Sequence, residues 1–161
     1  MADDKPEFIT PPNTLKSKVR TGGPGAVDMA ALDRAEQVIV GLTDNYLEWV
    51  QEDLEKIDRA YEALKKASGD RTSEVDAVFQ ASHDIKSQGG SFGYDMMTAI
   101  GHELCRLIEK AGSIGPSEME AINLHINAMK LVIAEDIKGE GGEQGKQMLS
   151  GLQQVCEKLL A

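Results

Sequence analysis

Apolar residues recur at intervals of three and four positions after Asp28, which is the spacing of an amphipathic helix. The first series predicts one buried stripe, carried by a short helix that leads into a long one and ends before Ser68. Gly41 interrupts the series only weakly, so the two segments can also form one kinked helix. The predicted inward positions are Leu32, Ala35, Ile39, Leu42, Tyr46, Trp49, Leu54, Ile57, Tyr61 and Leu64.

Further helices are predicted after this one, each bounded by Gly, Pro or a hydroxyl residue. They begin after Thr72 or Ser73, at about 95, at Ser117 and after the Gly-rich turn at 139–142. The hydroxyl of Thr72 or Ser73 can cap the first of them, and Ser117 with Glu120 can form a capping box. No strand pattern is evident. We therefore expect an all-α fold, an antiparallel four-helix bundle with additional terminal helices.

Residues 1–27 have a different composition, with four prolines and a Gly-Gly-Pro-Gly cluster that oppose regular structure. We expect a flexible N-terminal arm here, followed by a helical bundle domain over 28–161. The arm contains the basic residues Lys16, Lys18 and Arg20. A solvated tail is the simpler interpretation of this arm, and recruitment of a partner is the alternative.

The composition narrows the function. The chain has 161 residues, about one domain, with 41% hydrophobic but only 4% aromatic residues, which suits helix packing. A formal net charge of −10 disfavours a nucleic-acid partner. No secretory signal or membrane-spanning run is apparent, and Cys105 and Cys156 are expected to be reduced thiols. We therefore expect a cytoplasmic protein that has no membrane partner and is a monomer.

His83 is the candidate reactive residue because of its position on the second predicted helix. With Val78, Ser82 and Ile85 turned inward, His83 lies about 100° from Ser82, at the border between core and solvent. Lys86, Ser87 and Gly90 share its side of the helix. The predicted surface therefore presents an imidazole next to an ammonium group and small residues.

Each of these residue types has a use in accepting a phosphoryl group. A neutral imidazole is a good nucleophile near pH 7, since its pKa is about 6.5. Lys86 can steady phosphoryl oxygens, and Gln88 offers a further donor. Ser87, Gly89 and Gly90 lack bulk, so another protein's active site can approach the ring.

The segment from His83 to Gly93, His-x-x-Lys followed by small residues and a later Gly, resembles the phosphorylation motif of histidine-containing phosphotransfer (HPt) domains. The likeness continues in a Leu-x-x-Leu-Glu-like pattern within 100–109 and covers roughly 45–138. It implies a four-helix bundle in which a ring nitrogen of His83 is phosphorylated. Ser87 departs from the pattern, where Gly is usual, and this puts partner preference in question.

The resemblance also implies partners. Receiver domains of response regulators, or a hybrid histidine kinase, would exchange the phosphoryl group with His83. We expect no cofactor in this chain, with Mg²⁺ on the partner receiver domain, and no kinase activity because the chain has no nucleotide site. His102, on the next helix, is a candidate supporting residue. The alternative function is a non-catalytic helical adaptor that uses the same surface only for binding.

Other residues have simpler interpretations. His125 is expected to be structural or exposed, and a zinc site from His102, Cys105 and His83 lacks a fourth ligand nearby. The Gly-rich run before Lys146 does not match a phosphate-binding loop. A docking patch close to His83 is predicted from Ile85, Phe92, Tyr94, Met96 and Met97.

Overall fold

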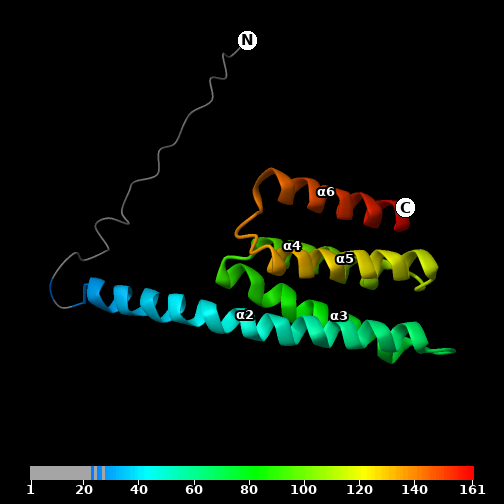
Figure 1. Cartoon of the computed structure of the whole chain (residues 1–161), viewed down its shortest axis with the longest axis horizontal. Helices are drawn as coiled ribbons and strands as arrows, with labels where there is room; N and C mark the ends of the chain where they lie inside the picture. The colour runs from blue at the N-terminus through cyan, green and yellow to red at the C-terminus, as the bar shows by residue number, and fades with distance from the viewer. Residues whose placement is uncertain (1–22, 24, 27) are drawn as a thin grey trace, which may run out of the picture. The chain divides into compact units, whose positions relative to one another are not determined.

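The structure, a computed structural model, describes residues 23, 25, 26 and 28–161. These residues form five α-helices and one short 3₁₀-helix, joined by turns, and they contain no strand. In chain order they are α2 (Met29–Lys66), α3 (Thr72–Gly89), η1 (Gly90–Phe92), α4 (Asp95–Lys110), α5 (Pro116–Ala134) and α6 (Gly142–Leu159), shown in Figure 1. The all-α prediction is confirmed, and one additional terminal helix, α6, follows the four-helix bundle.

A boundary between two units falls after Gly41, within α2. Nearly all of the predicted arm, residues 1–22, 24 and 27, lies outside the described residues. In the first unit, α2 begins where the Asp28 carboxylate accepts a hydrogen bond of 3.0 Å from the N–H of Ala30. This bond satisfies an amide that has no partner inside the helix.

The apolar stripe of α2 is buried only in part. The side chains of Tyr46, Leu54 and Leu64 are buried, as the helical spacing predicts. The same prediction is wrong for Leu32 and for other early members, whose exposed fractions are 45% for Leu32, 53% for Ile39, 37% for Leu42 and 42% for Trp49. Periodicity shows that a helix has an apolar side, but it does not show what covers that side.

In the second unit, residues 42–161, helices α3, α4 and α5 run alternately up and down beside the later part of α2 (Figure 1). Helix α6 packs on α4 and α5. The central core consists of fully buried aliphatic side chains from each bundle helix: Ile57, Leu64, Val78, Ile85, Ile100, Leu104, Leu107, Ile122 and Ile126. Burying side chains of this size contributes about 1.5–3 kcal/mol each relative to leaving them exposed.

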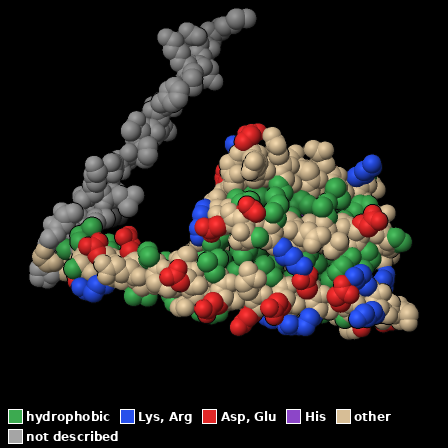
Figure 2. All heavy atoms as spheres, in the orientation of Figure 1, with side chains coloured by type: hydrophobic (Ala, Val, Ile, Leu, Met, Phe, Trp, Pro, Cys, Tyr) green, Lys and Arg blue, Asp and Glu red, His purple; other side chains and the backbone are tan. Residues whose placement is uncertain are grey.

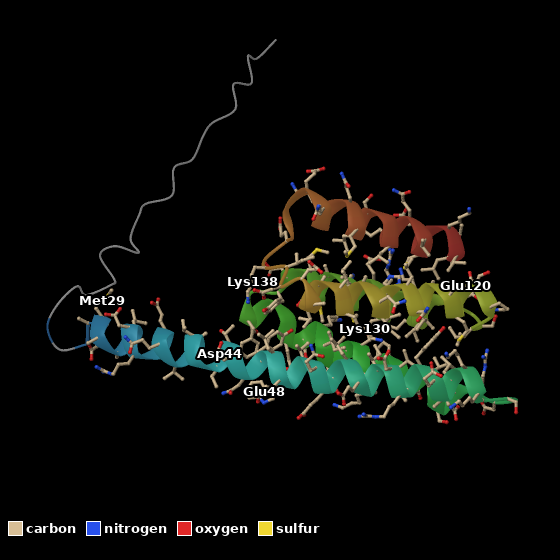
Figure 3. All side chains as sticks on the ribbon, in the orientation of Figure 1. Met29, Asp44, Glu48, Glu120, Lys130 and Lys138 are labelled. Carbon is tan, nitrogen blue, oxygen red and sulfur yellow. The ribbon has the colours of Figure 1, made fainter. Side chains whose placement is uncertain are left out.

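Polar contacts join α2 to α5 at the side of this core. The Tyr61 hydroxyl donates a 3.1 Å hydrogen bond to the carbonyl of Met119. The ammonium of Lys130, which Figure 3 shows on α5, lies 2.6 Å from the Asp58 carboxylate of α2. Both side chains of this ion pair are partly exposed, so it adds little stability.

Two helix starts differ from their predicted caps. At α3 the Asp70 carboxylate, not a hydroxyl of Thr72 or Ser73, accepts the N–H of Thr72 at 3.0 Å. At α5 the Glu118 carboxylate accepts the N–H of Gly115 at 2.9 Å, so the box predicted for Ser117 and Glu120 is wrong. Gly115 is the N-cap and has no side chain, so only the Glu118 half of a capping box forms. The helix begins earlier than predicted because Pro116 occupies the first turn of α5, where its missing N–H is not needed.

A tight reversal connects α3 to α4. After η1, Gly93 has a φ of 82°, a left-handed conformation that side chains disfavour. Its carbonyl accepts the N–H of Gly139 at 2.6 Å, and the carbonyl of Gly139 accepts the N–H of Met96 at 3.1 Å. The reversal thus ties the end of α3 to the turn before α6, which gives a physical reason for the Gly ten residues after His83.

Charged side chains are scattered over the visible surface, and several carboxylates lie along α2 (Figure 2). Four aromatic side chains, those of Tyr46, Trp49, Phe92 and Tyr94, form one cluster in the second unit. There the Tyr46 ring stacks on Phe92 with centroids 4.6 Å apart, and the Trp49 ring meets Phe92 edge-on at 6.2 Å. No described helix is long and apolar enough to cross a membrane.

Candidate phosphotransfer site

Helix α3 presents His83 to solvent because the neighbouring positions are used by the core. Val78, Ser82 and Ile85 are buried, while the His83 side chain is exposed, as the helical spacing predicts. The His83 ring lies beside Phe79, one turn earlier, with centroids 6.2 Å apart and planes inclined by 32°. The imidazole is therefore accessible to a partner, while the opposite side of α3 is packed in the core.

A small polar contact lies beneath His83, between α3 and α4. The buried Ser82 hydroxyl donates to the carbonyl of Gly101 at 3.3 Å and accepts from the Cys105 thiol at 3.5 Å. Burial raises the pKa of Cys105, an effect that the hydrogen bond between Cys105 and Ser82 and the charge of Lys86 oppose. Cys105 is therefore a protonated packing residue, not a thiolate nucleophile.

Lys86 follows His83 by almost one turn and is half-buried. Its backbone lies very close to α4, since a Cβ added at Gly101 would be 2.8 Å from the Lys86 Cβ and 3.1 Å from its Cα. None of the ion pairs among the described residues includes Lys86. Its ammonium is thus not neutralised by a carboxylate of the described residues and is available to an incoming anion.

The small residues after Lys86 have different surroundings. Ser87 is exposed, and its hydroxyl donates to the Asp84 carbonyl of its own helix at 2.8 Å, so it is turned back to the backbone. Gln88 is half-buried and Gly90 is exposed. Gly89 was predicted to leave room for a partner, but it is buried against α4. A Cβ added at Gly89 would lie 2.8 Å from the Met97 Cβ.

Thr98 of α4, which the sequence analysis missed, contacts the last turn of α3. Its hydroxyl donates to the carbonyl of Lys86 at 2.9 Å and accepts the N–H of Gly90 at 2.9 Å. Thr98 and Gly101 are small residues three positions apart on α4, and this spacing was the available signal for a close contact.

Among the described residues, no hydrogen bond or ion pair joins a side chain of α4 to the His83 ring. His102 is exposed, and no hydrogen bond or ring contact joins it to His83 within the described part of the chain. Glu103, the residue after His102, is buried, and its carboxylate lies 2.8 Å from the Arg106 guanidinium. A supporting role for His102 stays a prediction.

His125 is a structural residue, one of the two outcomes expected for it. It is fully buried in α5, with Nδ1 2.7 Å from the Ala121 carbonyl and Nε2 3.5 Å from the Cys156 sulfur of α6. Burial lowers the pKa of His125, with smaller opposing effects from the Ala121 hydrogen bond and the Glu103 charge. A neutral His125 ring can donate a hydrogen bond from Nδ1 to the Ala121 carbonyl and accept one at Nε2 from the Cys156 thiol. The second bond joins α5 to α6.

The docking patch predicted beside His83 is wrong. Ile85, Tyr94, Met96 and Met97 have exposed fractions of 2% or less and belong to the core. Phe92 alone of that set is half-buried. Residues 94–97 follow the reversal and turn beneath α3, so closeness to His83 in sequence does not place them on its surface.

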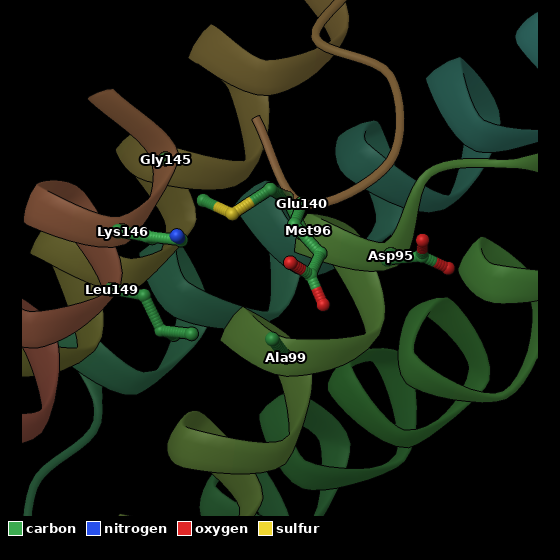
Figure 4. Close-up of a pocket in the computed structure, with 7 residues that line it drawn as sticks. All are labelled: Asp95, Met96, Ala99, Glu140, Gly145, Lys146 and Leu149. Atoms are coloured by element: carbon green, nitrogen blue, oxygen red, sulfur yellow. The ribbon is translucent and has the colours of Figure 1, made fainter. Parts of the chain in front are cut away.

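A pocket lies away from the His83 surface, between α4 and the start of α6 (Figure 4). It is lined by Asp95, Met96, Ala99, Glu140, Gly145, Lys146 and Leu149. None of these residues belongs to α3. The described residues contain no group of three or more side chains arranged to hold a metal ion.

In the comparison with protein families, the model of the Hpt domain matches residues 41–136. The matched segment ends before α6 and begins at the residue that closes the first unit. Comparisons with curated proteins and with solved structures give no match.

Proposed function

The chain belongs to the Hpt domain family, the phosphotransfer modules of two-component systems, and from that premise we propose that His83 is its phosphoryl carrier. His83 accepts the phosphoryl group from a receiver-domain aspartate or from a histidine kinase and passes it to a response regulator. The observation that supports this assignment best is the exposed imidazole on an anchored helix, with the ammonium-bearing residue Lys86 on the same side.

The chemistry requires little from this chain beyond position and charge. A neutral ring nitrogen of His83 attacks phosphorus of an aspartyl phosphate, an N–P bond forms, and the O–P bond breaks to release the aspartate carboxylate. The other ring nitrogen keeps its proton. The reverse reaction delivers the group to the next aspartate. We expect Mg²⁺ to be held by the partner receiver domain, where it neutralises phosphoryl oxygens during transfer.

The surrounding residues have distinct roles in this proposal. The ammonium of Lys86 approaches the phosphoryl oxygens and stabilises their charge. Exposed Ser87 and Gly90 leave the ring open to a partner, whereas half-buried Gln88 offers an amide donor at the edge. Buried Gly89 serves the site indirectly, since it lets α3 lie close to α4.

A transfer assay tests the proposal. Receiver domains from the same organism are loaded with radioactive acetyl phosphate and Mg²⁺, and each is then mixed with the wild-type chain. We expect label on the chain that is labile in acid and stable in base, as phosphohistidine is. His83→Ala should abolish it, while His102→Ala, a change at another exposed histidine, should leave the label on the chain.

Binding measured in parallel separates the two candidate functions. A receiver domain that binds wild type but never transfers label would make the chain a helical adaptor. Label that persists in His83→Ala would place the phosphoryl group on another residue and remove the proposed carrier.

A further inference from the structure

The Thr98 hydroxyl occupies a particular place in the backbone of α3. In an α-helix the carbonyl of residue 86 and the N–H of residue 90 would bond to each other. Here the Thr98 hydroxyl bridges the two groups, donating to the Lys86 carbonyl at 2.9 Å and accepting the Gly90 N–H at 2.9 Å. A side chain of α4 is thus inserted at the last turn of α3, where the helix changes to the 3₁₀ turn η1.

This last turn is the part of α3 that flanks His83 on its C-terminal side. Its main chain is held against α4 at two adjacent points, because the Lys86 backbone also lies against Gly101, one turn beyond Thr98. The hydroxyl bridge therefore fixes the backbone from which the Lys86 side chain extends. It fixes the backbone of the exposed Gly90 as well.

We propose that Thr98 is a positioning residue for phosphoryl transfer, which acts by holding the Lys86 backbone through its hydroxyl; this inference rests on the proposed function of His83. Without the hydroxyl, the Lys86 carbonyl and the Gly90 N–H can bond directly and tighten the last turn of α3. The Lys86 ammonium then shifts relative to the His83 ring. Transfer reactions that depend on positioning are sensitive to such shifts, and a misplacement of about 1 Å can cost about 100-fold.

The first test compares Thr98→Val, which keeps the shape but loses the hydroxyl, with Thr98→Ser, which keeps the hydroxyl. Transfer to His83 is measured at saturating receiver domain, using the acetyl-phosphate-loaded receiver that labels wild type, and the Kd of that receiver is measured separately. We expect Thr98→Val to slow transfer roughly tenfold, less than the ~100-fold of a full ångström shift, with Kd changed by less than about twofold. Thr98→Ser should restore most of the rate.

Tyr61→Phe is the matched control for a purely structural effect. It also removes a hydroxyl that binds a backbone carbonyl, but that bond joins α2 to the Met119 carbonyl. Its transfer rate should equal that of wild type. A rate loss in Tyr61→Phe as large as in Thr98→Val would mean that lowered stability alone slows transfer, which would overturn the inference.

A double-mutant cycle with Lys86→Ala identifies the route of the effect. If Thr98 acts through Lys86, Thr98→Val should slow the Lys86→Ala protein by less than about twofold, because the two changes are then not additive. A full tenfold loss on that background would contradict the inference. Amide hydrogen exchange at Gly90 provides a separate measure of the bridge, and Thr98→Val should alter it while Thr98→Ser does not.

The outcomes distinguish this inference from the proposed function. Absence of label on wild type and Thr98→Val alike would overturn the proposed function and the inference with it. Label on His83 of wild type, with Thr98→Val transferring at the wild-type rate, would overturn the role of Thr98 alone.

Discussion

Replacement of Gly101 by alanine adds a methyl group at the closest approach of α3 to α4. The new Cβ would lie 2.8 Å from the Cβ, 3.1 Å from the Cα and 3.3 Å from the backbone nitrogen of Lys86. These atoms cannot rotate away, since two belong to the backbone and the third is bonded to it. The two helices must therefore move apart around Lys86, the residue proposed to steady the phosphoryl group.

The magnitude follows from two opposing effects. Overpacking of this kind costs about 1–3 kcal/mol, and replacing Gly by Ala inside a helix gains about 1 kcal/mol. Because the blocked atoms are rigid, the cost lies in the upper part of its range. We expect Gly101→Ala to lower the free energy of unfolding by about 1–2 kcal/mol. For a chain of this size, each kcal/mol lowers Tm by about 2–4 °C.

The assay is urea unfolding at 25 °C, followed by circular dichroism, for wild type, Gly101→Ala and Gly151→Ala. Gly151 is the matched control, since it lies exposed within α6 and an added Cβ would meet nothing within 4 Å. Gly151→Ala should raise the free energy of unfolding by up to about 1 kcal/mol. If Gly101→Ala is stabilised to the same extent, the close contact between α3 and α4 does not exist as described.

Three further predictions concern charge and capping. Lys86→Ala should slow transfer to His83 with little change in receiver affinity or helicity, measured by label transfer and circular dichroism; unfolding of the variant would contradict the assigned position of Lys86. Glu118→Ala should lower the free energy of unfolding by about 0.5–2 kcal/mol through loss of the α5 cap, whereas Glu120→Ala should leave it within about 0.5 kcal/mol in the same urea assay. Because burial lowers the pKa of His125, the unfolded chain binds more protons below about pH 6.5, so stability should fall as the pH drops from there through the lower folded pKa. Urea midpoints between pH 7.5 and 5 should show a smaller decline in His125→Asn, and an unchanged decline would refute this assignment.

Much of the bundle follows from local patterns. The spacing of Val78, Ser82 and Ile85 predicts which side of α3 is buried, and hence that His83 is exposed, because three points on one helix determine its inner side. The ends of the helices were less predictable. The capping carboxylates are Asp70, two positions before Thr72, and Glu118, one position after Ser117, whereas the sequence favoured the hydroxyls.

Contacts between helices were not predictable in the same way. The bridge from Thr98 to Lys86 and Gly90 depends on the register of α4 against α3, and one sequence does not specify that register. The prediction of a docking patch was wrong for the same reason, since Tyr94 and Met97 pass beneath α3 after the reversal at Gly93. The exposed apolar positions at the start of α2 have the same helical spacing as buried ones, so periodicity alone cannot separate them.

The central claim is that His83 is the residue that carries the phosphoryl group. The most direct measurement is tandem mass spectrometry, at neutral pH, of the wild-type chain after transfer from a phosphorylated receiver domain. The account predicts that a single phosphoryl group is found on His83, on a peptide that contains Lys86. A phosphoryl group on His102 or on a carboxylate, with His83 unmodified, would contradict it.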